Sequence, residues 1–306
     1  MLLDAASLYF RAFYGVPDSL KAPDGTPVNA VRGFLDTIAR LVAEHRPTRL
    51  VACWDEDWRP AFRVAALPSY KAHRRAADGT EEVPEKLTAQ VPLIIEALQA
   101  LGIVRAGAPG YEADDVIGTL VAREANAPAE HRAHRVDVVT GDRDLFQLVD
   151  DSAGVRVLYP TRKEVEVVDQ AWLRARYGIP DGDTYADLAI LRGDPSDGLP
   201  GVPGIGEKTA ATLLAKHGDL AGVIAAADHV SRLTPAQRTR IRESAEYLSA
   251  APGVVRVARD APVPELDDAV PAAPADPDDV GRLAQEWNLA SPLTRVVQAL
   301  SGGGSA

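Results

Sequence analysis

The chain has 306 residues, of which 46% are hydrophobic and 25% charged, and this length allows one large core or two modest domains. Its single cysteine, Cys53, excludes an internal disulfide framework and predicts a reducing, cytoplasmic compartment. We expect no membrane span, because no run of about 18 apolar residues is present, and no secretion, because the first residues lack the features of a signal peptide. The formal net charge of −11 argues at first against a nucleic-acid partner.

The charge is unevenly distributed along the chain. Residues 260–281 contain seven acidic residues and five prolines without Lys or Arg, which predicts a solvated, extended connector. The segment between Asp57 and Asp78 is free of acidic residues and contains five basic ones: Arg59, Arg63, Lys71, Arg74 and Arg75. Local potential matters more for binding than the net charge, so a polyanionic partner remains compatible with this chain. Residues 301–306 predict a flexible tail.

Strand and helix patterns alternate over the first half of the chain. Short apolar stretches predict strands at 1–5, 49–54, 103–106, 135–140 and 155–159. Helical periodicity is found at 31–42 and at 87–101, where Gly102 is a stop signal. This alternation favours an α/β domain built on a mostly parallel central sheet with helices on both faces.

After residue 168 the pattern is almost entirely helical. Helices are predicted at 170–177, 184–191, 207–216, 220–226, 235–248 and 277–287. We therefore expect an α/β domain at 1–168 and a helical domain at 169–306.

Acidic residues recur where the predicted strands end and where the helical region begins. The set comprises Asp4, Asp55, Glu112, Asp114, Asp115, Asp142, Asp144, Asp194 and Asp197. Ligands of parallel α/β sheets bind outside the carboxyl ends of the strands, and carboxylates that converge there need compensating cations. Hard oxygen ligands select Mg²⁺ or Mn²⁺, and two such ions about 3.5–4 Å apart can promote an in-line phosphoryl displacement. The absence of Cys and His from the set argues against zinc.

Most of these acidic positions also have a purely structural interpretation, but Asp4 and Asp55 are harder to explain in this way, because each closes an apolar strand. The acids at 112–115 suit a helix N-terminus, Asp142 after Gly141 suits an N-cap, and the acids at 194–197 suit a turn. Each position alone is a weak signal. Five groups in register at the strand ends together favour a metal site.

The order of these motifs resembles the bacterial 5′-nuclease family, which includes stand-alone flap endonucleases, phage 5′-exonucleases and the N-terminal exonuclease domain of DNA polymerase I. The resemblance runs from Leu2 to about residue 250 and rests on these segments: Leu3-Asp4-Ala5, Arg11-Ala12-Phe13, Asn29-Ala30-Val31-Arg32-Gly33-Phe34, Trp54-Asp55, Tyr70-Lys71-Ala72-His73-Arg74, Tyr111-Glu112-Ala113-Asp114-Asp115, Thr140-Gly141-Asp142-Arg143-Asp144, Gly193-Asp194-Pro195-Ser196-Asp197 and Gly201-Val202-Pro203-Gly204-Ile205-Gly206-Glu207-Lys208-Thr209-Ala210. The chain departs from the family at Gly198, where Asn is usual, and at Val28, where Thr is common.

The resemblance implies a PIN-like 5′-nuclease core at 1–168 with a helical arch at about 60–100, followed by a DNA-binding helical domain at 169–306. It also implies two divalent metal ions, Mg²⁺ or Mn²⁺, bound by the nine acidic residues. One ion would be held, directly or through water, by Asp4, Asp55, Glu112, Asp114 and Asp115. The other would be held or oriented by Asp142, Asp144, Asp194 and Asp197.

The resemblance places Tyr70, Lys71 and Arg74 at the base of the arch, facing the scissile phosphate. In a helix, Lys71 and Arg74 would share a face, so that Arg74 offers a bidentate fork and Lys71 a compact charge to the transition state. Tyr70 would stack on a base near the cut. Taken alone, these residues fit a solvated basic helix face with a packed tyrosine. Residues 74–84 lack apolar periodicity and predict a mobile part of the arch through which a 5′ single strand threads.

The segment Gly204-Ile205-Gly206, followed by a helix from Glu207, predicts a hairpin-type phosphate grip. Glycines allow close backbone approach, and the free N–H groups of a helix start attract phosphate. By resemblance, this element and Lys208 bind duplex DNA downstream of the cut, often with a monovalent cation such as K⁺ at the turn. Arg11 and Arg75 are further candidate DNA contacts.

We therefore predict a structure-specific 5′-nuclease with 5′-3′ exonuclease and flap endonuclease activity in DNA replication and repair, acting as a monomer with a polymerase in trans. The alternatives are a PIN-like metal-dependent ribonuclease, a non-catalytic DNA-junction binding protein and a small-molecule phosphatase with Asp-x-Asp chemistry. The grip and the basic arch favour DNA junctions over RNA. The complete acidic set argues against a decayed site. Ala6 and Ser7 after Asp4 do not fit the phosphatase pattern.

Overall fold

The computed structural model describes residues 1–76, 79–128, 130, 132–161, 164–229 and 232–302. Within this part of the chain, six strands form one sheet in the order β3-β2-β1-β4-β5-β6. They are β1 (Leu2–Asp4), β2 (Val51–Cys53), β3 (Val104–Ala106), β4 (Val136–Val139), β5 (Val155–Pro160) and β6 (Val165–Val168). The pairs from β3 to β5 are parallel, and β6 is antiparallel to β5. The five predicted strands are confirmed, whereas the edge strand β6 was not predicted.

The strand order reverses beside β1. The chain builds β1, β2 and β3 outward on one side and then returns to place β4 against the other side of β1, so that Leu2 pairs with both Val51 and Val138. In open α/β sheets such a switch point leaves a crevice at the carboxyl ends of the strands, where ligands bind. The topology therefore locates the site between β1 and β4.

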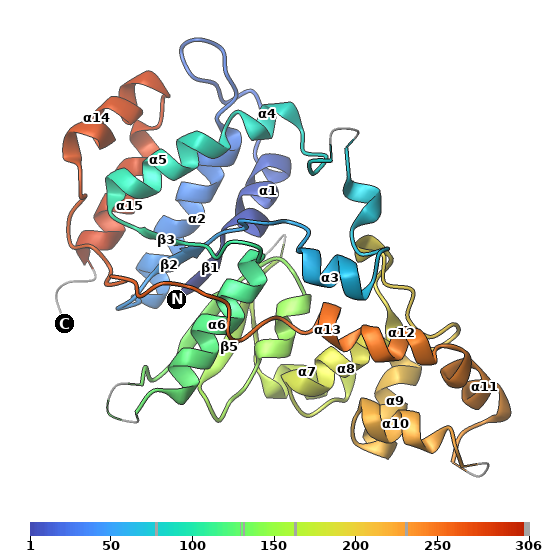
Figure 1. Ribbon diagram of the computed structural model, residues 1–306. Helices are drawn as coiled ribbons and strands as arrows, with labels where there is room; N and C mark the ends of the chain where they lie inside the picture. Colours follow the sequence, from blue (N-terminus) through green and yellow to red (C-terminus); the bar gives the residue numbers. More distant parts are fainter. Residues whose placement is uncertain (77–78, 129, 131, 162–163, 230–231, 303–306) are drawn as a thin grey trace.

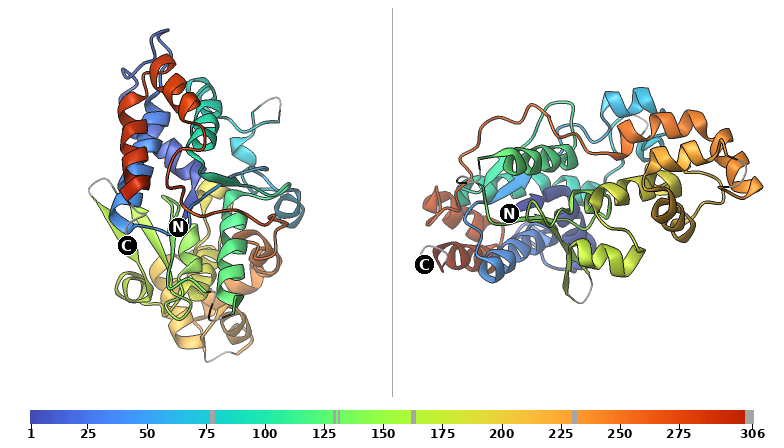
Figure 2. Two further views of the ribbon diagram at one scale, coloured as in Figure 1. Left: turned by 90° about the vertical axis from the view of Figure 1, so that its left-hand side faces the viewer. Right: turned by 90° about the horizontal axis from the view of Figure 1, so that it is seen from below.

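Helices cover both faces of the sheet, as predicted (Figures 1 and 2). Successive strand residues point to opposite faces, so Leu2 and Val138 pack in one core while Leu3 and Val139 pack in the other. The first core is covered by α6 (Ala113–Asn126), α7 (Gln170–Tyr177) and α8 (Gly182–Arg192). The second is covered by α1 (Ala5–Gly15), α2 (Asn29–His45), α5 (Val91–Leu101), α14 (Pro277–Glu286) and α15 (Ala290–Gly302).

The predicted helix at 87–101 is two helices, α4 (Glu85–Thr88) and α5, because Pro92 in the first turn of α5 cannot continue a preceding helix. Gln90 lies between them, and its buried Oε1 accepts a hydrogen bond of 2.8 Å from the Ala30 N–H at the start of α2. Val28, the N-cap residue of α2, supplies no side-chain cap. Because the first N–H groups of a helix lack partners inside it, Gln90 caps α2 from a distance.

The helical region is built from short helices stacked on α8. They are α9 (Glu207–His217), α10 (Leu220–Ala226), α11 (Pro235–Glu243), α12 (Ala245–Ala250) and α13 (Pro252–Val255). The predicted helix at 235–248 is interrupted at Ser244. α8 contacts both α9 and α13, so the helical region is joined to the sheet's own helix layer.

The acidic stretch predicted as a solvated connector is extended but docked. After α13 it runs back across the front of the sheet in Figure 1. The Leu50 N–H donates to Asp268 O at 2.8 Å, the Val270 N–H donates to Thr48 O at 3.0 Å, and Val263 is buried. These contacts correct the prediction of a free connector at 260–281.

The end of the chain packs on the N-terminal layers. α14 contacts α5, and α15 contacts α2, far from α9 to α12 (Figure 1). The range 169–306, expected to form one helical domain, therefore spans two packing environments. Of the expected tail at 301–306, residues 301–302 belong to α15, and the other four lie outside the described residues.

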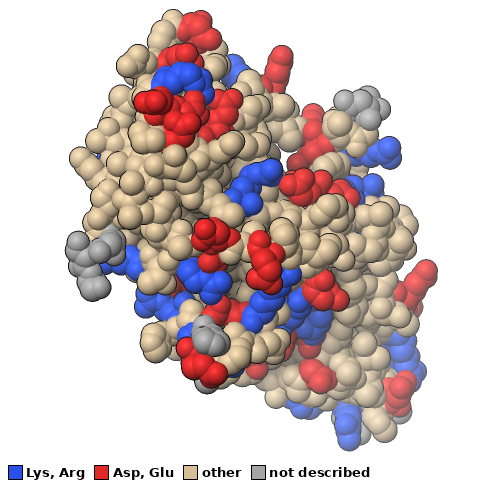
Figure 3. Space-filling view, turned by 60° about the vertical axis from the view of Figure 1, so that its left-hand side comes forward, with Lys and Arg blue, Asp and Glu red and all other residues tan. Residues whose placement is uncertain are grey.

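Positively and negatively charged side chains are interspersed on the side of the molecule that carries α14 and α15 (Figure 3). At this end of the molecule Arg282 forms ion pairs with Glu96, Asp279 and Glu286. In the part of the chain that the structure describes, no helix has the length and apolar character needed to cross a membrane.

Candidate active site

A cavity of about 700 Å³ lies at the carboxyl ends of β1, β2 and β4. Seven of the nine predicted acidic residues line it: Asp4, Asp55, Glu112, Asp114, Asp142, Asp144 and Asp194. Basic side chains line it too: Lys71, Arg74, Arg143 and Arg192. The sheet thus gathers carboxylates that are distant in sequence, as the strand-end pattern predicted.

Asp4 is fixed at the switch point by the first turn of α1 and by Thr140, which follows β4. It ends β1 and caps α1, because one oxygen accepts the Ser7 N–H at 3.1 Å and the other accepts the Thr140 hydroxyl at 2.6 Å. Burial, aided by the carboxylates of Asp55 and Asp142 and opposed by the Thr140 hydrogen bond, raises the pKa of Asp4 to about 7.

Three more carboxylates in the cavity carry charge that the fold does not neutralise. Burial raises the pKa of Asp114 well above its usual range, and the charges of Asp4 and Asp142 add to the effect. Burial, followed by the charge of Asp142, raises the pKa of Asp144 to about 8. Burial also raises the pKa of Asp55 to about 6, although it accepts the Ala113 N–H at 2.7 Å. Raised carboxylate pKa values of this origin mark a site that favours a bound cation.

The carboxylates are held apart by backbone donors. Asp142 accepts the Asp144 N–H at 2.9 Å before the short helix η2 (Asp144–Leu148), and Asp194 accepts the Ser196 N–H at 2.8 Å before η3 (Pro195–Asp197). Among the described residues, no three Asp, Glu, His or Cys side chains are gathered closely enough to hold an ion in this conformation. Like charges repel, which favours this separation. The donor set, which is all hard oxygen, fits Mg²⁺ or Mn²⁺.

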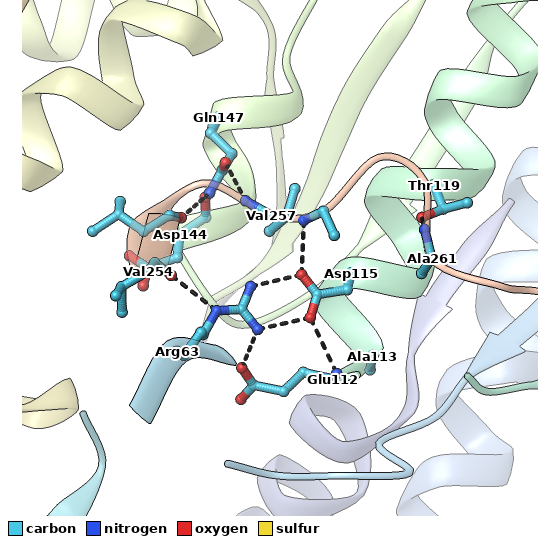
Figure 4. Close-up of polar contacts among 12 residues, drawn as sticks. Arg63, Glu112, Ala113, Asp115, Thr119, Asp144, Gln147, Val254, Val257 and Ala261 are labelled. Carbon is cyan, nitrogen blue, oxygen red and sulfur yellow. Dashed lines mark hydrogen bonds and ion pairs between the residues drawn. The ribbon is translucent and has the colours of Figure 1, made fainter. Parts of the chain in front are cut away.

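Asp115 was predicted to be a metal ligand, and the structure gives it a different role. The residue is 0% exposed and accepts the Arg63 guanidinium at 2.6 and 2.7 Å, the Ala258 N–H at 2.8 Å and the Glu112 N–H at 3.2 Å (Figure 4). These four donors use its acceptor positions. Asp115 is therefore the partner of a buried arginine and does not face the cavity.

Arg63 was missed as a functional residue because it was counted with the exposed basic run. It lies in α3 (Ala61–Ala66), is buried, and also donates to Glu112 at 2.6 Å. A signal was available, since an arginine between Phe62 and Val64 in an apolar helix needs an acidic partner when it is buried.

Lys71 is held in an uncommon conformation. Its φ of 47° lies in the left-handed region, which non-glycine residues adopt only when their surroundings impose it. Its N–H donates to Asp197 O at 2.9 Å, and its ammonium group pairs with Glu112. The backbone and the side chain of Lys71 thus join two of the acidic segments.

Tyr70 and Arg74 differ from their predicted arrangement. The Tyr70 ring is 5% exposed and its hydroxyl donates to Glu112 at 2.8 Å, so it cannot stack on a base in this conformation. Lys71 and Arg74 do not share an α-helical face, because only a 3-10 turn, η1 (Ala72–Arg74), follows Lys71. Arg74 instead pairs with Asp197.

The arch after η1 begins as a hairpin. Arg75 and Glu81 form an antiparallel bridge within the range 74–84, which was predicted to lack regular structure; Asp78 lies outside the described residues. Glu81 lines the cavity, and burial raises its pKa. The position of Glu81 in the cavity was not predicted from the sequence. The side chains of Arg75 and of Arg11 on α1 are exposed, as DNA contacts require.

The predicted phosphate grip has the expected backbone geometry. Gly206 is the N-cap of α9, and Gly204 has a φ of 71°. This positive φ favours glycine, and the absence of a Cβ atom lets the guanidinium of Arg240 approach the backbone of Gly204. Ile205 is buried and can offer only its backbone, whereas Lys208 is exposed.

Comparison with known proteins identifies relatives over the whole chain. Residues 1–178 match the family model of the N-terminal resolvase-like domain of 5′-3′ exonucleases, and residues 181–278 match that of their C-terminal SAM fold. A 5′-3′ exonuclease of Streptomyces coelicolor is 60% identical, covering 98% of this chain and 100% of that protein. One of Mycobacterium tuberculosis is 51% identical, covering 98% and 97%. DNA polymerase I of Mycobacterium bovis is 37% identical over 99% of this chain but only 32% of the polymerase.

Solved structures show the same fold at lower sequence identity. T5 5′-exonuclease with bound divalent metal ions (zinc) has a TM-score of 0.65 at 17% identity, covering 98% of this chain and 97% of that one. The catalytic core of Rad2 in complex with DNA substrate has a TM-score of 0.59 at 17% identity, covering 99% and 92%. Human GEN1 in complex with Holliday junction DNA has a TM-score of 0.61 at 17% identity, covering 97% and 71%.

Proposed function

The chain belongs to the 5′-3′ exonuclease family, and we propose that it is a divalent-metal-dependent, structure-specific 5′-nuclease that hydrolyses DNA phosphodiesters at 5′ ends and flaps. The observation that carries this proposal is the cavity at the switch point, where carboxylates with raised pKa values lie beside Lys71 and Arg74. Anionic groups there suit metal ions, and the adjacent cations suit a phosphate.

The carboxylates that line or border the cavity would bind two ions, Mg²⁺ or Mn²⁺. The residues assigned to them are Asp4, Asp55, Glu112, Asp114, Asp142, Asp144, Asp194 and Asp197. When bound, such ions supply hydroxide from coordinated water and stabilise the leaving oxygen of an in-line displacement. The products would carry a 5′-phosphate and a 3′-hydroxyl, without a covalent intermediate.

Lys71 and Arg74 would bind the scissile phosphate. In the free protein they are paired with Glu112 and Asp197. If metal ions shared the charge of those carboxylates, Lys71 and Arg74 would be available to the phosphate oxygens. A charge placed there is stronger in the low-dielectric site than in water and stabilises the pentavalent transition state.

Gly204, Gly206 and Lys208 would bind duplex phosphates away from the cut, with K⁺ as a candidate ion at the turn. Free N–H groups at the start of α9 and the exposed ammonium of Lys208 supply the attraction. Relatives in the same family include DNA polymerase I, so a polymerase acting in trans remains part of the proposal. Action as a monomer in the cytoplasm also remains a prediction.

A product-length assay on a 5′-labelled flap tests this function. With Mg²⁺ or Mn²⁺ we expect short labelled products cut at or near the junction, and with excess EDTA no product. Full activity in EDTA would contradict the metal requirement. Cleavage of single-stranded RNA in preference to the flap would favour the ribonuclease alternative.

A further inference from the structure

Arg63 is the centre of a buried polar network next to the cavity (Figure 4). Its guanidinium donates to Glu112 at 2.6 Å, to both oxygens of Asp115 at 2.6 and 2.7 Å, and through Nε to Val254 O at 2.9 Å. Together with Lys71, which pairs with Glu112, the group has two positive and two negative charges. The network is therefore neutral without a metal ion, unlike the carboxylates at the centre of the cavity.

The two oxygens of Glu112 have different surroundings. Oε2 accepts from the Arg63 guanidinium at 2.6 Å and from the Tyr70 hydroxyl at 2.8 Å, so it is held on the buried side. Oε1 accepts from Lys71, whose side chain lines the cavity. Holding Oε2 fixes the carboxylate plane and leaves Oε1 directed toward the cavity.

The same network ties Glu112 to the chain segment that leaves the helical region. Arg63 bonds to Val254 in α13, and Asp115 accepts the Ala258 N–H just beyond it. α13 follows α12 and packs on both α3 and α8. Arg63 thus joins three segments: its own helix α3, the start of α6 at Glu112, and α13 at the end of the helical region.

We propose that Arg63 is a positioning residue for cleavage, which orients Glu112 toward the metal ions by holding its Oε2 and locks that orientation to the 254–258 segment through Asp115. This inference rests on the proposed function. Groups that orient metal ligands tune the affinity of the site although they never touch the ion.

The geometry requires a guanidinium and not merely a positive charge. The planar fork of Arg63 reaches two carboxylates and a carbonyl at once, whereas a lysine ammonium is a single point on a flexible stem. The Arg63→Lys variant keeps the charge and loses the fork. It therefore separates orientation of Glu112 from simple charge balance.

Thr119 provides a matched control. It is buried, and its hydroxyl accepts the Ala261 N–H at 3.0 Å, which anchors the same returning segment without touching Glu112 (Figure 4). Thr119→Val keeps the shape and removes that anchor. If Arg63 serves only to hold the segment down, the two variants should behave alike.

The test measures the rise in melting temperature on titration with Mn²⁺, together with flap cleavage and flap binding in Ca²⁺. For Arg63→Lys we expect the Mn²⁺ concentration at half of the rise to increase roughly 10- to 100-fold and kcat at limiting Mn²⁺ to fall, with flap affinity retained. For Thr119→Val we expect a lower melting temperature without metal and an unchanged Mn²⁺ midpoint. Asp115→Asn, which is isosteric, is a second route to the same midpoint shift should Arg63→Lys not fold.

The outcomes separate this inference from the proposed function. If the unaltered chain neither melts higher with Mn²⁺ nor cleaves the flap, the proposed function fails. If it does both, but Arg63→Lys has the same Mn²⁺ midpoint, or Thr119→Val shifts it equally, then Arg63 is only a structural anchor and the inference is overturned.

Discussion

The carboxylates of the site fall into two groups that the fold treats in opposite ways. The paired group comprises Glu112, Asp115 and Asp197, which lie at the base of the arch and form ion pairs with Arg63, Lys71 or Arg74. The unpaired group comprises Asp4, Asp55, Asp114, Asp142, Asp144 and Asp194, which line the cavity and form no ion pair within the described residues.

This difference separates carboxylates whose charge the fold itself balances from carboxylates whose charge it leaves to a bound cation, and Glu112 and Asp197 of the paired group remain proposed metal ligands. The fold supplies its own cations to the paired group, so loss of a member should cost stability. It supplies none to the unpaired group, and burial raises the pKa of four members: Asp4, Asp55, Asp114 and Asp144. Loss of one of these should cost activity and relieve repulsion in the metal-free protein.

Asp144→Asn should show the largest functional effect. Loss of a carboxylate that binds metal should remove several kcal/mol of transition-state stabilisation, which corresponds to a loss of kcat/KM on the order of a thousandfold. The measurement is flap cleavage at saturating Mg²⁺. In EDTA the same variant should melt higher than the unaltered chain, and a lower melting temperature would contradict the assignment of Asp144 to the unpaired group.

Asp115→Ala should show the opposite pattern. The change leaves Arg63 with only part of its acceptors, and breaking a buried pair in this way typically costs about 3 kcal/mol or more of unfolding free energy. Urea denaturation in EDTA measures this loss. If the variant were as stable as the unaltered chain, the assignment of Asp115 to the paired group would be wrong.

Lys71→Ala should lower the rate more than the affinity. Removal of one charge that stabilises the transition state costs about a hundredfold in kcat, whereas the grip and the exposed arginines still bind the flap. Single-turnover cleavage and binding in Ca²⁺ separate these effects. Weak binding with an unaltered rate would reduce Lys71 to a DNA contact.

Stability without metal should fall as the pH rises. The folded-state pKa values of Asp55, Asp4 and Asp144, at about 6, 7 and 8, exceed the usual Asp value. The folded protein therefore holds protons that the unfolded chain has released, and stability declines from about pH 4 to about pH 8. Melting in EDTA across this range measures the decline. Asp144→Asn should flatten its upper part, and Mn²⁺ should diminish it; a curve rising with pH would contradict the shifts.

Lys208→Ala should have the smallest effect. Loss of one phosphate contact weakens duplex binding modestly and reduces the salt dependence of log K by about one unit. Binding titrations in Ca²⁺ at several salt concentrations measure this slope. The cleavage rate at saturating substrate should stay unchanged, and a large fall in that rate would move Lys208 into the active site.

The sequence was sufficient to predict which parts of the chain meet. Apolar strands followed by acids, such as Leu2-Leu3-Asp4, carry strand and site information together, because parallel strands align their carboxyl ends. The start of α9 could also be predicted from local sequence, because Gly206 is a suitable N-cap residue and an acidic residue, Glu207, begins the helix.

Contacts between side chains distant in sequence were not predictable. The capping of α2 by Gln90 joins residues 60 positions apart, whereas the helix break before α5 could have been predicted from Pro92. The capture of Asp115 by Arg63 depends on the burial of α3 against α13, and local patterns make Asp115 look the same as Asp114. The edge strand β6 is short and pairs only with β5, and its burial is mixed, with Val168 buried and Val167 exposed, so its sequence lacks a clear strand pattern.

Binding of Mn²⁺ to the folded chain, counted by titration calorimetry, tests the central claim most directly. The account predicts that the unaltered chain binds two ions and that Asp144→Asn, although folded and melting higher in EDTA, loses one of them or binds it far more weakly. Identical Mn²⁺ isotherms for the two proteins would contradict the claim that the unpaired carboxylates form the metal site.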